Sequence, residues 1–176
     1  MSDLLAHAFG IAALALNVFC MLCRCDVAMR RHSVLAGCLW ALNNVLIGAH
    51  SAAALSMVSA GRTATSSATL DRSRVARRNM FLLFLGITIA AAAVTWTGPI
   101  SVVTLAASMM STYAMFYMHG AALRLSMLAA SILWMFNAWE FGSWEQMAAN
   151  VLTGCAAAYG AWTLARAKGQ SATQAT

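Results

Sequence analysis

Charged residues are scarce in this chain of 176 residues: they make up 9% of it, against roughly a quarter of an average soluble domain. Hydrophobic residues make up 61%. Runs of about 20 apolar residues, enough for a helix to cross the hydrocarbon of a membrane, take up almost the whole chain. The composition therefore excludes a soluble domain and predicts an integral membrane protein in contact with the lipid bilayer.

Acidic residues are scarcer still, and the five that occur lie near the ends of the apolar runs. Paired membrane carboxylates, a Ser-His-Asp set and a glycine-rich phosphate loop cannot be assembled from them. We therefore expect no enzyme. Proton coupling is also disfavoured, because no carboxylate or histidine occupies the middle of a run, where a proton relay would need one.

Cysteines number five, and an odd count inside or beside apolar segments argues against a disulfide framework. The series Cys20-x-x-Cys23-x-Cys25 offers metal ligands only superficially. Structural zinc usually takes four ligands in paired clusters, and no second cluster occurs. We expect no metal and no cofactor. Nucleic acid is excluded as well, because the net charge of +6 comes from arginines clustered at the ends of the runs.

Seven apolar runs are predicted to span the membrane as helices, at residues 4–23, 33–50, 51–70, 79–97, 99–118, 122–141 and 145–165. The third is rich in Ser and Thr and contains Arg62, so a hydropathy criterion alone would leave six spans. With seven, every Lys and Arg except Arg62 falls on one side, as expected of the cytoplasmic side. This favours a multi-pass protein with a periplasmic N-terminus and a cytoplasmic C-terminus.

An offset of 94 residues lays Leu39, Trp40, Asn43 and Gly48 over Leu133, Trp134, Asn137 and Gly142. The same offset sets Ser56 opposite Asn150 and leaves the fourth span unpaired. An odd number of helices between the copies makes them parallel repeats. The alternative is a chance match between two apolar hairpins of similar composition.

The resulting fold class is all-α: seven transmembrane helices as two parallel three-helix bundles joined by a linker helix, or 3+1+3. Residues 1–70 form the first bundle, 71–97 a basic loop and the linker helix, and 98–168 the second bundle. Residues 169–176 are expected to be a disordered tail, since they have nothing apolar to bury.

The chain resembles the bacterial inner-membrane YgjV family. The likeness rests on Ala60-Gly61-Arg62-Thr63, on residues 111–116 followed by His119-Gly120 and Arg124, and on Trp134, Asn137, Trp139 and Gly142-Ser143. The resemblance implies an inner-membrane location and a fold related to the SWEET and PQ-loop proteins, which mostly carry small solutes and include some sorting receptors. Those proteins usually carry prolines in their repeat helices. Pro99 is the only proline here, which puts a proline-hinged mechanism in doubt.

Arg62 is the most informative single residue, because it lies about 16 Å into the third span, near the bilayer centre. A charge there costs about 2.5 kcal/mol or more and normally faces a partner or a wet cavity. It would anchor a small polar or anionic solute, or else reach toward the cytoplasmic side. Asn43 and Asn137 would line a shared pathway or form interhelical hydrogen bonds.

Two function classes remain open from the sequence. The first is a small-solute transporter or facilitator with a site between the two bundles. The alternative is a non-transporting membrane scaffold or receptor with the same fold. Seven residues are candidates for binding the solute: Asn43, Arg62, Asn137, Asn150, Ser56, Trp40 and Trp134. For the two tryptophans, stacking on a ligand competes with ordinary packing.

Overall fold

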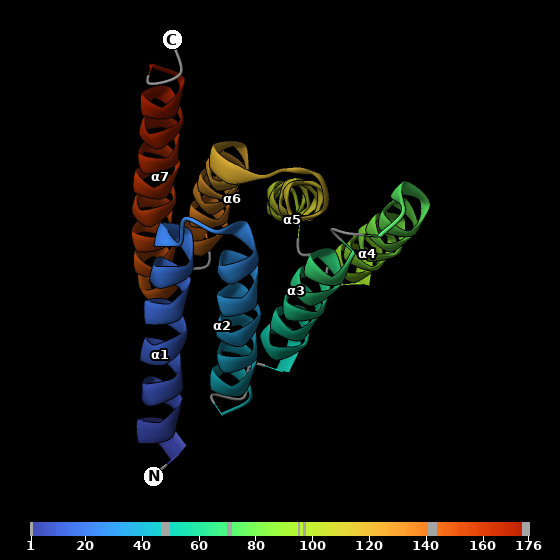
Figure 1. Ribbon diagram of the computed structural model, residues 1–176. Coiled ribbons are helices and arrows are strands. Elements are labelled where there is room, and N and C mark those ends of the chain that lie inside the picture. The colour runs from blue at the N-terminus through green and yellow to red at the C-terminus, as the bar shows by residue number, and fades with distance from the viewer. Residues whose placement is uncertain are drawn as a thin grey trace.

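The computed structural model describes residues 2–46, 50–69, 72–94, 96, 98–140 and 144–173, and it folds them into seven helices (Figure 1). The helices are α1 (Ser2–Leu22), α2 (Asp26–Leu46), α3 (His50–Ala68), α4 (Arg74–Val94), α5 (Ile100–Tyr117), α6 (Gly120–Glu140) and α7 (Trp144–Thr173). Each overlaps one predicted span. The helical state of the Ser/Thr-rich third segment is confirmed.

The end of the chain differs from the expectation. Helix α7 continues to Thr173, whereas the sequence predicted no structure after Lys168. The segment contains no proline to stop the helix, and Ala165, Ala167 and Lys168 are strong helix formers. Residues 169–173, which were predicted to belong to a disordered tail, are therefore helical. Residues 174–176 lie outside the described part.

Consecutive helices pack into two groups, which we call the first helix group (α1, α2, α3) and the second helix group (α5, α6, α7). Within each group the second helix packs on both of its neighbours. Two further contacts join the groups: α1 packs on α7, and α3 packs on α5. Adding 94 to the residue numbers of α1 and α3 gives approximately those of α5 and α7. The α1–α7 and α3–α5 contacts are therefore equivalent under the predicted repeat.

Helix α4 packs on α5 and α3, through contacts that include the edge-on rings of Phe81 and Tyr117. The helices are not all upright relative to one another. In Figure 1, α5 is seen nearly end-on, whereas α1 and α2 run up the page. Helix α5 is therefore steeply inclined to α1 and α2, whereas α7 runs in nearly the same direction as α1.

The buried core lies where the groups meet and is built mainly of small and flexible side chains. Its members come from five helices: Cys20, Met21, Met29, Ala114, Met115, Leu123, Met127, Ala156 and Ala157. Met21 and Met115 are again 94 residues apart. Methionine fills irregular gaps well, which suits the steep crossing of the helices at this point.

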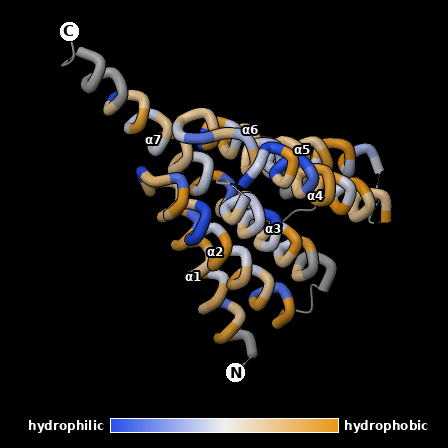
Figure 2. The backbone as a smooth tube through the Cα atoms, turned by 45° about the vertical axis from the view of Figure 1, so that its right-hand side comes forward, coloured by the Kyte–Doolittle hydropathy of each residue, from blue (hydrophilic) through white to orange (hydrophobic). Residues whose placement is uncertain are grey.

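Large apolar side chains cover the outside. Leu4 is 76% exposed, Val94 88% and Trp139 67%, and Figure 2 shows hydrophobic residues along the outer helices. Such surfaces are stable in lipid but not in water. By length and composition, three helices of the described part qualify as membrane spans: Leu4–Leu22, Arg74–Val94 and Ile100–Tyr117. Helices α2, α3, α6 and α7 are not among these three, although Gly120–Phe136 in α6 is a shorter apolar helix.

Candidate functional site

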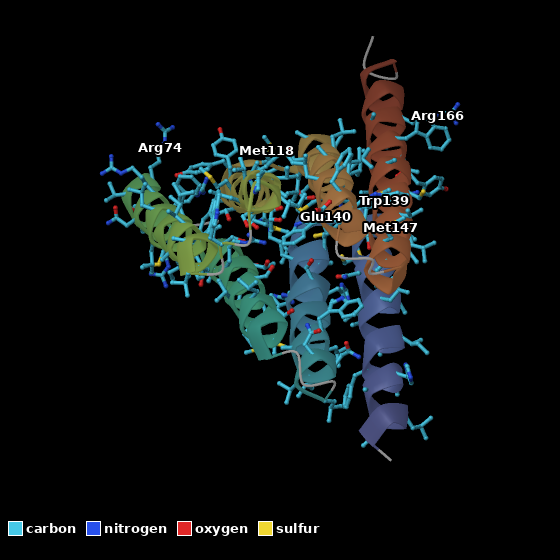
Figure 3. The ribbon with its side chains drawn as sticks, turned by 180° about the vertical axis from the view of Figure 1, so that it is seen from behind. Arg74, Met118, Trp139, Glu140, Met147 and Arg166 are labelled. Atoms are coloured by element: carbon cyan, nitrogen blue, oxygen red, sulfur yellow. The ribbon has the colours of Figure 1, made fainter. Side chains whose placement is uncertain are left out.

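Three arginines turn into the protein from α2, α3 and α6. The side chains of Arg30 and Arg124 have no exposed surface, and Arg62 is half-buried. Arg74 and Arg166, in contrast, project outward (Figure 3), and the Arg166 guanidinium lies 4.3 Å from the centre of the Trp162 ring. A buried charge is costly unless its surroundings compensate it. The partners of the three interior arginines therefore define the polar site.

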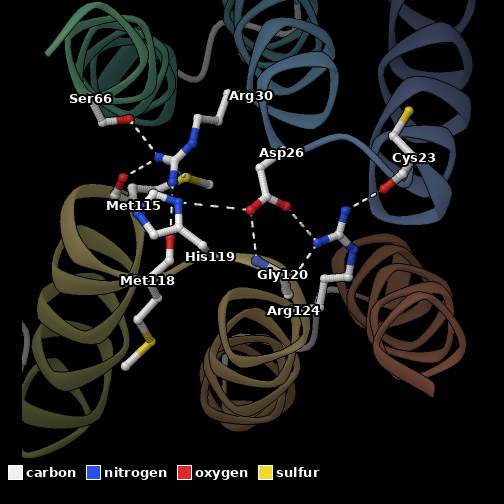
Figure 4. A network of polar contacts seen from close by, with 9 residues as sticks. All are labelled: Cys23, Asp26, Arg30, Ser66, Met115, Met118, His119, Gly120 and Arg124. Carbon is white, nitrogen blue, oxygen red and sulfur yellow. Dashed lines mark hydrogen bonds and ion pairs between the residues drawn. The ribbon is translucent and has the colours of Figure 1, made fainter. Parts of the chain in front are cut away.

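Arg124 is paired with a carboxylate where the two helix groups meet (Figure 4). Its Nη1 donates to Asp26 Oδ1 at 2.8 Å and to the Gly120 carbonyl at 2.9 Å. Its Nε and Nη2 donate to the carbonyls of Met21, at 3.3 Å, and Cys23. Those two carbonyls belong to the C-terminal end of α1, where backbone acceptors lack helical partners and a cation is favoured.

Arg30 likewise binds backbone carbonyls at the C-terminal end of a helix, in this case α5. Its Nη1 donates to the Met115 carbonyl and to Ser66 Oγ at 3.0 Å, and its Nη2 donates to the Met118 carbonyl at 3.1 Å. No carboxylate of the described residues pairs with it. Asp26 lies one turn earlier on α2, but its oxygens face Arg124, the Gly120 N–H at 2.6 Å and His119 Nδ1 at 3.8 Å.

The two arginines form a reciprocal pair. Arg30 and Arg124 are separated by 94 residues, the offset of the predicted repeat. Each lies near the start of the second helix of its own group, and each holds the C-terminal carbonyls of the first helix of the other group. At the predicted repeat offset, the two arginines thus make matched interactions across the interface between the groups.

Two glycines complete this junction. Gly120 adopts φ +60°, a conformation that favours glycine, and this directs its N–H at Asp26. Gly160 on α7 lies against the junction: a Cβ there would collide with the Met21 carbonyl oxygen and would lie 3.2 Å from Arg124 Cδ. Its position is the repeat equivalent of Ser66, which contacts Arg30.

Arg62 lies on the contact between α3 and α5, which we call the α3–α5 seam. Its Nη1 donates to Thr112 Oγ1 at 2.9 Å and to the Ser108 carbonyl at 3.4 Å, both on α5. Its Nη2 donates to Ser59 Oγ on α3 at 3.0 Å. Its Nε is buried and has no partner among the described residues. Arg62 thus reaches from one helix group into the other.

The other predicted site residues in the first helix group take part in helix contacts. Asn43 Nδ2 donates to the Ala6 carbonyl at 2.7 Å, which joins α2 to α1. Ser56 Oγ accepts a hydrogen bond from Asn44 Nδ2 at 3.3 Å, which joins α3 to α2. No hydrogen bond of the described part brings Asn43 or Ser56 to Arg62.

In the second helix group, Asn150 on α7 and Trp134 on α6 are half-buried, and so is Trp40 on α2 of the first group. Asn137 belongs to α6, but its side chain lies outside the described part, as do Gly48 and Gly142. The predicted pairing of Asn43 with Asn137 across a pathway therefore stays a prediction.

The remaining clusters do not form a second polar site. Cys23 Sγ lies 3.8 Å from His32 Nδ1, and Cys20 Sγ lies 3.7 Å from Ser33 Oγ. Within the described ranges, no three His, Cys, Asp or Glu side chains gather as metal ligands do. An open depression of about 410 Å³ on α7 is lined by apolar side chains and suits lipid rather than a polar solute.

The junction residues Asp26, Arg30 and Gly160 were missed as site residues by the sequence reasoning, and Arg124 was noted only as part of the family resemblance. Arg30 and Arg124 were interpreted as markers of the cytoplasmic side of the membrane, because both lie close to a predicted cytoplasmic loop. One signal was available: arginine occurs at both residue 30 and residue 124, which are 94 residues apart, as are Trp40 and Trp134.

Comparison with known protein families gives a match. The model of the family Imp-YgjV, described as bacterial inner membrane protein, matches residues 4–168. The chain belongs to this family. Its membership confirms the resemblance and the inner-membrane location, and it accounts for the apolar outer surface. Searches of curated proteins and of solved structures found no match.

Proposed function

We propose that this inner-membrane protein is a small-solute facilitator or transporter whose solute passes between the two helix groups along the α3–α5 seam. The proposal includes seven membrane spans in a 3+1+3 arrangement related to that of SWEET proteins, a periplasmic N-terminus and no catalytic activity. One observation carries it: Arg62 crosses from the first helix group to Thr112 in the second, with its Nε left for a further partner.

The position of this contact supports a path for solute. The α3–α5 contact is one of the two that join the groups, so a relative movement of the groups would open it. Hydroxyl groups line it, since Ser59 on α3 and Thr112 on α5 both accept hydrogen bonds from Arg62. Polar groups in the membrane interior usually mark solute or ion pathways.

The other candidate residues take a second place in this proposal. Asn137, Asn150, Trp40 and Trp134 would line the neighbouring parts of the path. Asn43 and Ser56 already have hydrogen-bond partners between helices, so their contribution would be to hold the first helix group in shape.

Uptake or counterflow into proteoliposomes tests the proposal, with a panel of labelled neutral sugars, amino acids and small carboxylates. We expect at least one class to enter faster than into protein-free liposomes. Arg62→Ala should slow that flux by about tenfold or more, since a hydrogen bond from a charged group contributes roughly 1.5–3 kcal/mol. Arg31→Ala, an exposed neighbour of Arg30, is the matched control and should leave the flux unchanged.

Absence of flux for the whole panel would overturn the proposal. If a stable protein partner also co-purified with the wild-type protein, the scaffold or receptor alternative would replace it.

A further inference from the structure

The interior arginines differ in how their charge is compensated. Asp26 pairs with Arg124, whereas Arg30 and Arg62 are held by neutral oxygens alone. Asp26 also lies 3.8 Å from His119 Nδ1, so its charge is directed at Arg124 and His119 rather than at Arg30 or Arg62. Two of the three interior positive charges therefore have no carboxylate partner in the part of the chain that the structure describes.

The hydroxyl groups beside these arginines cannot supply the missing charge. Ser66 Oγ accepts from Arg30 and donates to the Thr63 carbonyl at 2.8 Å. Thr112 Oγ1 accepts from Arg62 and donates to the Ser108 carbonyl at 2.7 Å. Each hydroxyl is a neutral link between a guanidinium group and the backbone.

Both guanidinium groups also keep a free donor. The Nε atoms of Arg30 and Arg62 are buried and have no hydrogen-bond partner among the described residues. The whole Arg30 side chain is inaccessible to solvent. Nε together with one Nη is the donor pair that guanidinium groups use to bind carboxylate and phosphate oxygens.

The two arginines lie along the same seam. On α3 they contact Ser59 and Ser66, which are roughly 10 Å apart by helical rise. On α5 they contact Thr112 and Met115. The seam therefore carries two positive charges between the helix groups, in surroundings where an unpaired charge is costly and two like charges repel each other. An anion would relieve both effects.

We propose that the α3–α5 seam binds a small oxyanion of the carboxylate or phosphate class, with Arg62 as the deeper and Arg30 as the more cytoplasmic binding residue. This rests on the proposed function and names its substrate class. The anion would take the free Nε donors, and parting of the two helix groups would admit it. The neutral hydroxyl and carbonyl partners would keep each guanidinium group in position while the seam is empty.

Binding to purified protein in nanodiscs tests this without any transport. The probes are inorganic phosphate and acetate, compared with chloride at equal ionic strength, and the readout is the melting temperature from tryptophan fluorescence. We expect phosphate or acetate to raise the melting temperature above its value in chloride. Arg62→Gln and Arg30→Gln should each weaken this effect by about tenfold in anion concentration, the loss of one charge-assisted bond.

Arg31→Gln removes the same charge from the exposed neighbouring position and should bind as the wild type does. If a Gln variant fails to fold, Arg62→Lys keeps the charge and should still respond to anion, at higher concentrations. No response of the wild type beyond that to chloride overturns the inference, and so does an equal loss in Arg31→Gln.

The two proposals fail in different ways. Anion binding with no flux would sustain this inference and refute the transport function. Flux of a neutral solute, with no response to phosphate or acetate, would sustain transport and refute the anion site.

Discussion

The contact between Asp26 and Arg124 should make a large contribution to the stability of the junction between the two helix groups. Arg124 is fully buried and Asp26 is 18% exposed, with 2.8 Å between Nη1 and Oδ1. Asp26→Asn would leave the guanidinium group buried without a carboxylate. Removing one partner of a buried pair typically costs about 3–5 kcal/mol.

The structure favours the lower end of that range. After Asp26→Asn, Arg124 would still donate to the carbonyls of Met21, Cys23 and Gly120. We therefore expect a loss of about 3 kcal/mol in the free energy of unfolding. For a chain of this length that corresponds to a melting temperature lower by about 6–12 °C.

A double-mutant cycle in detergent or nanodiscs gives the measurement, with Asp26→Asn, Arg124→Gln and the double variant. The double variant should lose less than the sum of the single losses, by about 2 kcal/mol, because the two residues contact each other directly. Glu140→Gln, an exposed carboxylate near the end of α6, is the control and should melt as the wild type does. Strictly additive losses, or an unchanged Asp26→Asn, would refute the buried pair.

Two further predictions concern residues near the same junction. Gly160→Ala should destabilise the protein by about 1–3 kcal/mol in thermal unfolding, because its methyl group would meet the Met21 carbonyl and Arg124; Gly86→Ala on α4, with open space around it, should not. The backbone N–H groups of Ala28 and Val27 lower the pKa of the exposed Cys25 thiol. Maleimide should therefore label Cys25 faster than an ordinary thiol, whose pKa is about 8.5, at pH values below that pKa, and the rate should fall as the pH falls through the lowered pKa. In the proposed topology the label enters from the cytoplasmic side, and labelling from the periplasm would contradict that orientation.

The helices were predictable because lipid imposes a simple rule. Backbone groups in hydrocarbon must bond within the helix, so long apolar runs become helices of nearly fixed length. The helical state of α3 was predicted as well, from charge placement rather than from hydropathy. The extension of α7 to Thr173 was missed because polar composition was taken as a sign of disorder, although helix propensity continued there.

The junction was not predictable from residue type alone. An arginine near a helix end can face the cytoplasm or turn inward to the carbonyls of another helix, and both uses leave the same local sequence. What separates them is the partner, and Arg30 finds its partners on α5, more than 80 residues away. The interior position of Arg62 was predictable, because charge placement made the third segment a helix with Arg62 near its middle. Its partners on α5 were not.

The most direct measurement for the α3–α5 seam as a solute path is the accessibility of position 59. Ser59 is replaced by cysteine in a background without the five native cysteines, with Leu55→Cys, one turn away and 42% exposed on the outer surface, as the control. An anionic methanethiosulfonate reagent should modify Ser59→Cys, more slowly in the presence of transported solute, and leave Leu55→Cys unmodified, since lipid keeps a thiol protonated. Equal inertness of both positions, or equal reaction at both, would contradict a solute path along the seam.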